Sequence, residues 1–381
     1  MIESAIKLRH ELHKCAELSG HEAKTKELLM AAIRSDTKLE VRDRGSWFYA
    51  YYDCGADDAT GGVTVRNIAF RADMDALPMD DIGDLKDPCT GYGYSSETAG
   101  VSHRCGHDGH CAALYALARL LSERGASNNV CLIFQHAEET GAGARECAKL
   151  IDEKKIEEIY AFHNWSGFDE GSVVLREGTI MCASEGLRIT MKGKASHASR
   201  PEDGANPAEA LAQLAAKAGR LGRDELFHGR VMVTIVGINT GGRNFGMAPG
   251  EGEVDITLRA RCEEDMLALE REIIACAEEI ACESDLEVYF EKEDVFPETA
   301  NAADAVAKVR ASAEKLGLKV CELENPVRSS EDFGRYCKKC SGAMIFIGNG
   351  KSWPQIHTTE YDFNDRILGT AAELFHTVIS V

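Results

Sequence analysis

The sequence predicts a two-domain α/β protein in which a mostly parallel sheet domain is interrupted by a smaller inserted domain. A chain of 381 residues exceeds the size of one ordinary hydrophobic core. Short apolar strands alternate with helices towards both ends of the chain, which is typical of a parallel sheet covered by helices. Between these regions the order of elements becomes β-α-β-β-α-β, that of a split-βαβ, or ferredoxin-like, domain.

The first part of the chain, residues 1–182, alternates amphipathic helices with apolar strands. Helices are expected at about 2–14 and 21–35, followed by the strand-like runs LEVR, WFYAYYD and VRNIAFRAD. A third helix follows the segment HRCGHDGH, because leucines recur there at helical spacing. The strand NVCLIFQ, a Gly/Ala-rich helix and the strand IEEIYAFHNW complete this part.

The inserted domain is expected at 183–296, and the α/β pattern then resumes over 297–381. Its strands are GLRITMKGK, VMVTIVGINTG, GEVDITLRAR and LEVYFEKEDVF. Its helices are PAEALAQLAAKAGRL, where Pro207 suits the first turn, and EEDMLALEREIIACAEEIACE. The last part contains a predicted helix near 301–317, a helix over SSEDFGRYCKKC, the strand AMIFIGNG and a final helix near 364–379.

Composition restricts the possible partners of the protein. The net charge is −20, from 43 basic and 63 acidic residues, which disfavours binding to nucleic acid or to an anionic membrane. We find no signal peptide, and no apolar run approaches the ~20 residues of a membrane span. The 14 cysteines are scattered along the chain, which indicates reduced thiols. We therefore expect a cytoplasmic protein, whereas the charge says little about a small substrate, because a site can be locally cationic inside an acidic protein.

Polar residues follow several predicted strands of the larger domain. Because ligands of open α/β sheets bind beyond the carboxyl ends of the strands, we expect these side chains to meet at one edge of the sheet. In chain order they are Asp73, Asp75, His136, Glu138, Glu139, His163, Asn349 and His357. HRCGHDGH lies at the start of a helix and is expected beside them.

This pattern favours a site for two metal ions. Imidazole, carboxylate and thiolate are the groups that hold divalent transition metals. The candidate ligands exceed one four-coordinate site with an open position, but they suit two ions that share a ligand and together activate water. Those candidates are Cys105, His107, Glu139, His163 and His357. Hydrolysis also needs a base that is not a ligand, and one of Glu138 and Glu139 can serve if the two side chains point in different directions.

Other interpretations of the same residues stay open at this point. Each histidine or acid taken alone could be a helix cap, a turn residue or a solvated side chain. Cys105 beside His107 at a helix N-terminus could be an activated nucleophile. That interpretation leaves the acidic pair and the distant histidines unexplained, so the joint occurrence of these residues favours a metal hydrolase.

The chain resembles the two-metal aminoacylase–carboxypeptidase family of amidohydrolases. Within that family it is most similar to hippurate hydrolases, auxin-conjugate hydrolases and N-acyl amino acid deacylases. The matching segments follow the family's order along the whole chain: FRADMDALP, HRCGHDGH, QHAEETGAGA, AFHNW, KGKASHASRPEDGANP, SSEDFGRY and IHTTEYDFND. The resemblance implies a metal-hydrolase catalytic domain formed by 1–182 and 297–381. It also implies that 183–296 is a lid and dimerisation domain, and hence that the protein is a homodimer.

The resemblance also implies roles for individual residues. The two ions, Zn, Mn or Co, would be held by Cys105, His107, Glu139, His163 and His357, with the cysteine as the bridging ligand. Glu138 would be the general base, and Asp75 would orient a ligand from behind the metal centre. In the lid, His197 would stabilise the oxyanion, while Asn244 and Arg259 would hold the carboxylate of the substrate.

Some segments depart from the common form of the family. His136 replaces the usual proline before AEE, and the segments NWSGFDEG, IHTTEYDF and GINTGGRNFGMAP also differ. These departures surround the expected substrate pocket, so the acyl group and the amino acid stay open. We expect cleavage of the amide bond of N-acyl amino acids, such as hippurate-like or acetylated substrates. The alternatives are a dipeptidase or carboxypeptidase on the same site, and a non-catalytic metal-dependent binding protein.

Overall fold

The protein consists of two compact units, and the larger one is built from three separate stretches of the chain. The computed structural model describes residues 1–55, 65–81, 83–88, 90–222 and 227–381. Unit 1 comprises Met1–Ile180, Thr299–Asn325 and Asp332–Val381. Unit 2 comprises Met181–Glu298 and also Pro326–Glu331, a short segment that the sequence assigns to the larger domain.

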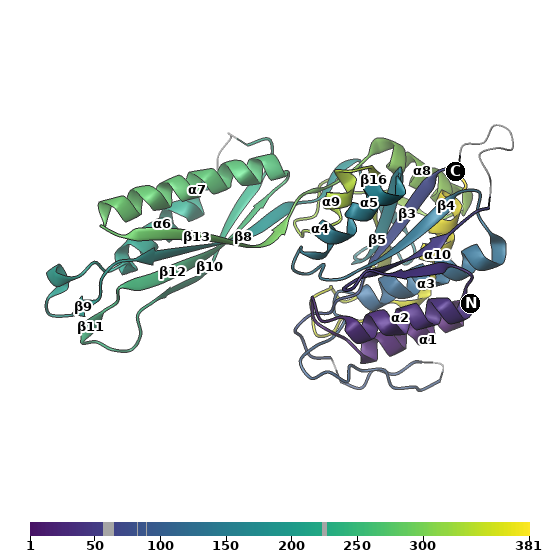
Figure 1. Cartoon of the computed structure of the whole chain (residues 1–381), viewed down its shortest axis with the longest axis horizontal. Helices are drawn as coiled ribbons and strands as arrows, with labels where there is room; N and C mark the ends of the chain where they lie inside the picture. Colours follow the sequence, from purple (N-terminus) through teal and green to yellow (C-terminus); the bar gives the residue numbers. More distant parts are fainter. Residues whose placement is uncertain (56–64, 82, 89, 223–226) are drawn as a thin grey trace. The chain divides into compact units, whose positions relative to one another are not determined.

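Unit 1 contains an eight-stranded sheet with the order β1-β2-β4-β3-β5-β16-β6-β15 (Figure 1). Its central strands β4, β3, β5 and β16 are mutually parallel, and β15 is parallel to β6. This arrangement confirms the predicted α/β fold with a mostly parallel sheet. The strands are β1 (Glu40–Asp43), β2 (Phe48–Tyr52), β3 (Asn67–Asp73), β4 (Asn129–Gln135), β5 (Glu158–Ser166), β6 (Val173–Leu175), β15 (Val320–Glu322) and β16 (Ser341–Gly350). Strands β7 (Gly178–Met181) and β14 (Thr299–Asn301) form a separate pair.

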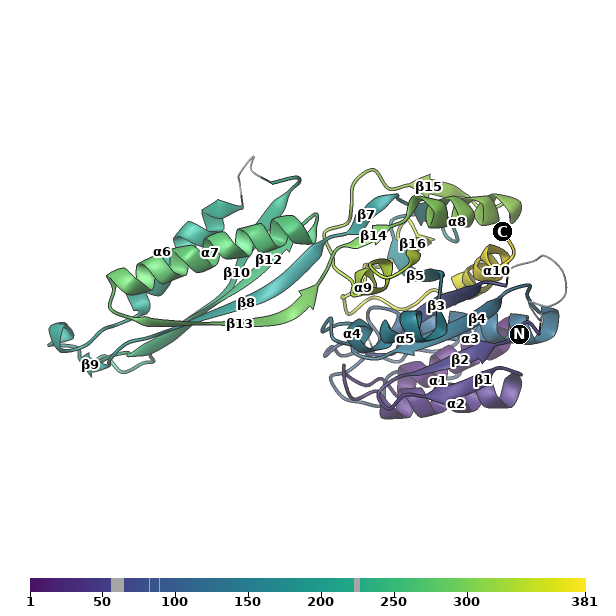
Figure 2. The same cartoon turned by 45° about the horizontal axis from the view of Figure 1, so that its top comes forward.

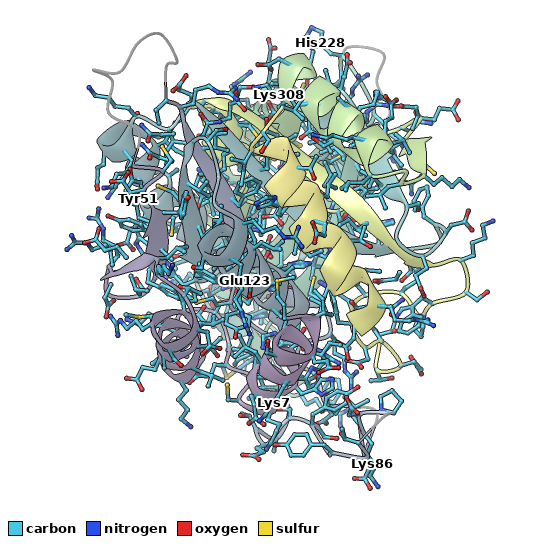
Figure 3. The ribbon with its side chains drawn as sticks, turned by 90° about the vertical axis from the view of Figure 1, so that its right-hand side faces the viewer. Lys7, Tyr51, Lys86, Glu123, His228 and Lys308 are labelled. Carbon is cyan, nitrogen blue, oxygen red and sulfur yellow. The ribbon has the colours of Figure 1, made fainter. Side chains whose placement is uncertain are left out.

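The core of unit 1 forms where helices cover this sheet. The helix α3 packs against α1, α10 and β3 and is buried over most of its length, and alanine and leucine occupy eight of its 14 buried positions. Polar side chains remain on the outer faces, as Lys7 of α1 and Glu123 of α3 show (Figure 3). The helices of unit 1 are α1 (Ile2–Lys14), α2 (Ala23–Asp36), α3 (His107–Arg124), α4 (Gly143–Cys147), α5 (Lys149–Lys154), α8 (Ala303–Lys315), α9 (Gly334–Cys337) and α10 (Leu368–Val378), with a 3₁₀ turn at Asp365–Ile367.

The helix predicted over SSEDFGRYCKKC is wrong in extent, because only Gly334–Cys337 is helical. Asp332, two residues before this helix, explains why the helix is shorter than predicted. Its carboxylate accepts hydrogen bonds from Arg71 at 2.9 Å, from Gln135 at 2.8 Å and from the amide of Ala144 at 2.9 Å. These long-range bonds hold the segment against the sheet, and they override its local helical tendency.

Unit 2 is a four-stranded antiparallel sheet with the order β10-β12-β8-β13, and α6 and α7 cover one of its faces (Figure 2). Strand β12 alternates strictly between buried and less buried residues, as a strand with only one covered face requires. The observed order is the predicted β-α-β-β-α-β. Its elements are β8 (Ala183–Lys192), β9 (Ser196–His197), a 3₁₀ turn at Pro201–Asp203, α6 (Ala208–Leu221), β10 (Val231–Thr240), β11 (Met247–Ala248), β12 (Glu251–Ala260), α7 (Glu263–Glu283) and β13 (Glu287–Phe296).

None of the helices in the described ranges is both long enough and apolar enough to cross a bilayer.

Candidate metal centre

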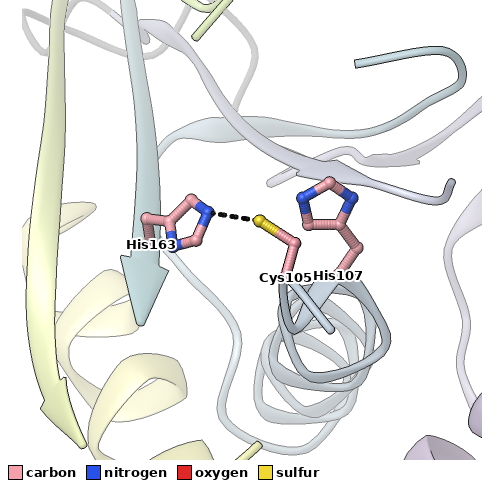
Figure 4. Close-up of side chains that lie close together, drawn as sticks. All are labelled: Cys105, His107 and His163. Atoms are coloured by element: carbon pink, nitrogen blue, oxygen red, sulfur yellow. Dashed lines mark hydrogen bonds between the residues drawn. The ribbon is translucent and has the colours of Figure 1, made fainter. Parts of the chain in front are cut away.

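Side chains with metal-binding groups meet at the carboxyl ends of the central strands of unit 1. The thiol of Cys105 lies 3.3 Å from Nε2 of His163, in the carboxyl-terminal half of β5 (Figure 4). It also lies 3.2 Å from Nε2 of His357, in the loop after β16. Cys105 and His163 are buried, whereas the side chain of His357 is 48% exposed. One end of the cluster therefore opens to solvent, where a substrate can enter.

The acidic pair after β4 completes the cluster. Nε2 of His107 lies 3.7 Å from Oε1 of Glu139 and 3.8 Å from Oε2 of Glu138. Oε1 of Glu139 is also 3.6 Å from Nε2 of His357. The structure thus brings together all five residues that the sequence proposes as ligands, and it places the proposed base beside them.

The geometry of these donors fits a transition-metal ion. Nε2 of His107 and Oε1 of Glu139 are buried, and neither forms a hydrogen bond within the described residues. Ligands about 2.0–2.3 Å from one tetrahedral ion stand ~3.3–3.8 Å from one another. The observed separations of 3.2–3.7 Å between the donor atoms of the five candidate ligands agree with this spacing.

A positive charge in the cluster would stabilise the charged forms of its buried acidic groups. Burial, opposed by His107 and reinforced by Asp75, raises the pKa of Glu139 to about 7. Burial disfavours protonation of His107, but Asp73, Asp75 and Glu139 outweigh it and raise the pKa of this imidazole to about 10. Burial and then the charge of Glu139 raise the pKa of the Cys105 thiol well above its ordinary value. An activated thiolate nucleophile needs the opposite shift, so the environment of Cys105 favours a metal ligand.

Gly106 allows Cys105 and His107 to face the same site. Its backbone is left-handed, with φ at +92°, and it directly precedes the first residue of α3. A Cβ atom here would lie 2.6 Å from Oδ1 of Asn164 and 2.7 Å from the hydroxyl of Tyr361. Both the φ angle and the lack of space therefore require glycine between the two ligands.

Asp75 fixes the turn that carries the acidic pair. Its two carboxylate oxygens accept the backbone amides of Glu138 at 3.1 Å and Glu139 at 2.9 Å, and Ser19 donates its hydroxyl at 2.6 Å. Nδ1 of His107 lies 2.9 Å from the backbone oxygen of Asp75, and this carbonyl can only accept. In the neutral imidazole, Nδ1 therefore carries the proton, and Nε2 is left with a lone pair for a metal.

A buried polar chain lies behind the ligands, and sequence reasoning missed part of it. His110 contacts Asp73 through Nδ1 and Oδ1 of Asn164 through Nε2, both at 2.6 Å. Asn164 donates to the backbone oxygen of Cys105 at 3.2 Å and to the hydroxyl of Tyr361 at 2.5 Å. Asn164 directly follows the candidate ligand His163, and Tyr361 lies four residues after the candidate ligand His357. Their proximity to ligands was the only sequence indication of this role.

The three site residues predicted in the inserted domain all lie in unit 2, where His197 and Asn244 lie near one another and Arg259 lies apart from both. His197 of β9 pairs with Met247 of β11, and Asn244 lies in the loop just before β11, whereas Arg259 lies near the end of β12. Thr240 pairs with Gly252, so the loop that carries Asn244 begins at the Glu251 end of β12, and the strand from Glu251 to Arg259 spans roughly 26 Å. Asn244 and Arg259 of one chain therefore cannot hold the same carboxylate.

The local contacts of these residues are well defined. The amide of Ser199 donates to Nδ1 of His197 at 3.1 Å, so the proton of the neutral imidazole lies on Nε2 and can be donated. The guanidinium of Arg259 donates to the backbone oxygen of Arg328 and to Oγ of Ser330, both at 2.9 Å. These two acceptors lie in the segment Pro326–Glu331, which explains why that segment packs with unit 2.

Comparison with known proteins identifies the family of the chain. A model of peptidase family M20/M25/M40 matches residues 69–381. The chain belongs to peptidase family M20/M25/M40. It is 29% identical to the hippurate hydrolase of Campylobacter jejuni over 377 residues, which cover 97% of this chain and 94% of that relative. This M20 chain is therefore a metal-dependent amidohydrolase, and the family resemblance predicted from the sequence is confirmed.

Solved structures share the fold of this M20 chain over almost its whole length. A dinuclear metal binding peptidase of the M20 family from Bacillus subtilis has a TM-score of 0.80 at 24% identity. The match covers 99% of this chain and 97% of the Bacillus chain. An aminobenzoyl-glutamate utilization protein from Klebsiella pneumoniae has a TM-score of 0.72 at 19% identity. The match covers 99% of this chain and 95% of the Klebsiella chain.

Proposed function

We propose that this M20 chain hydrolyses the amide bond of N-acyl amino acids, such as hippurate-like or acetylated substrates, at a centre of two divalent metal ions. The observation that carries the proposal is a cluster of five candidate ligands with one further carboxylate, that of Glu138, beside it. The similarity to a hippurate hydrolase supports the choice of substrate class, because hippurate is itself an N-acyl amino acid.

Cys105 is the proposed bridging ligand. Its thiol belongs to two groups of closely spaced donors, one with His107 and His163 and the other with Glu139 and His357. Two such sets that share one sulfur suit two ions side by side, and a mixed N/O/S donor set suits Zn, Mn or Co. Ions held there would activate a water molecule and polarise the carbonyl of the substrate.

Glu138 is the proposed general base. Five candidate ligands are present without it, and its carboxylate lies 3.8 Å from Nε2 of His107. In this role it accepts the proton of the attacking water and then delivers that proton to the nitrogen of the leaving amine. Asp75 supports the role because it holds the amide of Glu138.

His197 is the proposed donor to the oxyanion that develops on the carbonyl oxygen of the substrate. Its Nε2 carries the proton when Ser199 occupies Nδ1, so it can stabilise negative charge without first being protonated. We propose that Arg259 and Asn244 hold the carboxylate of the substrate, since a guanidinium can bind it with two parallel hydrogen bonds.

We also propose a homodimer formed through the lid domain, residues 183–296. Asn244 and Arg259 lie too far apart within one chain to bind one carboxylate, so a shared site needs Asn244 from one subunit and Arg259 from the other. A cytoplasmic location agrees with the free thiols of the described cysteines. The net charge of −20 supports a small-molecule substrate in preference to nucleic acid.

A hydrolysis screen tests the proposal. Acetyl- and benzoyl-amino acids would be compared with dipeptides in the presence of Zn²⁺, Mn²⁺ or Co²⁺, with metal analysis of the purified protein. We expect the acylated substrates to be cleaved faster. Preference for dipeptides, whose amino end carries a free ammonium group, would instead identify a peptidase.

Glu138→Gln tests the base. We expect kcat to fall by about 10²–10⁴-fold while the metal content stays unchanged, because only proton transfer is lost. Glu123→Gln on the exposed face of α3 is the matched control. Near-normal turnover of Glu138→Gln would contradict the role of Glu138 as the general base.

A further inference from the structure

The turn between β4 and α4 carries Glu138 and Glu139 and has an unusual backbone. Ala137, directly before the pair, has φ at +48°, in the left-handed region that residues with a Cβ rarely adopt. The turn is closed by the amide of Gly141, which donates to the oxygen of Glu138 at 2.7 Å, and by the amide of Gly143, which donates to the oxygen of Ala137 at 3.0 Å. A left-handed alanine persists only where its surroundings hold it, and such strain concentrates at functional sites.

Two buried carboxylates hold three consecutive amides of this turn. Asp75 accepts the amides of Glu138 and Glu139. The third amide is that of the strained residue, since Ala137 donates to Oε1 of Glu22 at 2.8 Å. Glu22 lies 115 positions earlier in the chain, between α1 and α2, and it is 3% exposed.

The side chain of Glu22 does not cap the helix that follows it. It occupies the N-cap position of α2, yet its side chain makes no capping hydrogen bond to that helix. The same oxygen that receives Ala137 also accepts the amide of Gly20 at 2.8 Å, which fixes the side chain. Burial and then the charge of Asp75 raise the pKa of Glu22, so the carboxylate is held in this position at an electrostatic cost.

We propose that Glu22 is a positioning residue for the acidic pair: it holds the left-handed backbone of Ala137 and thereby directs Glu138 and Glu139 into the metal centre. The proposal rests on the roles assigned to that pair in the proposed function. Glu22 does not touch the reacting atoms. It acts through one backbone hydrogen bond, and loss of that bond lets Ala137 relax towards the common φ region.

Three variants of the full-length, metal-loaded enzyme separate positioning from general stability. Glu22→Ala removes the acceptor, whereas Glu22→Gln removes the charge and keeps an acceptor oxygen. The double variant Glu22→Ala/Ala137→Gly lacks the acceptor but has a residue that adopts positive φ without strain. The matched control is Glu17→Ala in the same connection, because Glu17 accepts from the amide and hydroxyl of Thr25 and does not contact the turn.

The kinetic measurement has a defined expectation. Glu22→Ala should lower kcat by ~10–100-fold with KM changed by less than about threefold, the range typical of groups that orient a metal site. Glu22→Gln should stay within about threefold of the wild type, and the double variant should recover most of the loss. Equal losses in Glu22→Ala and Glu17→Ala, or no recovery in the double variant, would overturn the proposal.

A second measurement does not depend on activity. Amide hydrogen exchange of the peptide over 133–141 should become about tenfold faster in Glu22→Ala and stay near wild type in Glu22→Gln and Glu17→Ala. Unchanged exchange in Glu22→Ala overturns the proposal. If the wild type cleaves none of the acylated substrates, the proposed function fails, and the exchange pattern still decides whether Glu22 holds the turn. Should Glu22→Ala not fold, Glu22→Asp, whose carboxylate is one methylene shorter, takes its place with the same expected outcomes.

Discussion

Replacing Gly106 with alanine should damage the metal centre, because the added methyl group has no space there. The new Cβ would lie 2.6 Å from Oδ1 of Asn164 and 2.7 Å from the hydroxyl of Tyr361, and both groups are buried. Asn164 links Cys105, His110 and Tyr361 through hydrogen bonds. The methyl group must therefore displace either this chain of hydrogen bonds or the segment between the two ligands.

The cost can be worked out from two contributions. A residue with a Cβ in the left-handed region costs about 1–2 kcal/mol. Disturbing one buried hydrogen bond costs about 1–3 kcal/mol more. The sum is about 2–5 kcal/mol, which corresponds to a fall in melting temperature of roughly 4–20 °C for a domain of 150–250 residues. The affinity for metal should fall as well, since the relative placement of Cys105 and His107 changes.

Gly317→Ala provides the control for the φ contribution alone. Gly317 also has positive φ, at +67°, but nothing lies within 4 Å of its Cβ position. The melting temperature of the Gly317→Ala variant should fall only by the smaller amount that corresponds to the left-handed φ contribution. The assay is calorimetric unfolding of both variants and the wild type at one fixed metal concentration, with metal content measured in parallel. Equal shifts in the two variants would falsify the proposed steric conflict at Gly106.

Three further predictions concern the metal and the buried charges. Cys105→Ser should lower bound metal together with activity, and full metal occupancy with lost activity would instead point to a thiol nucleophile. Chelation by EDTA should abolish turnover and lower the melting temperature, and added Zn²⁺ or Mn²⁺ should restore both; persistent activity in the chelated protein would exclude a catalytic metal. His13→Gln should change the pH dependence of stability: burial disfavours the charged imidazole, but Asp108 and Asp81 outweigh it and raise the pKa of His13 to about 9. The stability that charged His13 contributes, at most about 3 kcal/mol, is then fully present below pH ~6.5 and is lost as the pH rises towards 9. Urea unfolding of the wild type should show this decline, and an equal decline in the variant would contradict the assignment.

The sequence was most informative where a pattern is repeated within one element. Helical spacing marked α3, because one covered face imposes its period on the residues, and the order of strands and helices marked the fold of unit 2. The metal ligands could be proposed because imidazole, thiol and carboxylate groups followed successive strands. Their mutual distances then confirmed that they meet at one edge of the sheet.

Long-range hydrogen bonds could not be predicted in the same way. Glu22 and Asn164 carry no local pattern that distinguishes them from a helix cap and a strand residue. Their importance appears only when the fold brings Ala137 and Cys105 beside them. The shortened helix at Gly334–Cys337 has the same origin, since the partners of Asp332 come from β3 and β4. Contacts between distant segments decide such positions, and they leave no periodicity in the sequence.

The interrupted order of unit 1 has a consequence for biosynthesis. Strand β16 lies between β5 and β6 in the sheet, although all of unit 2 is translated before it. His357 is translated later still. During translation β5 and β6 therefore have unpaired edges, which are prone to pair with other chains. The nascent chain cannot complete its cluster of candidate ligands until His357 has left the ribosome, so a chain truncated before β16 should aggregate and should lack part of that cluster.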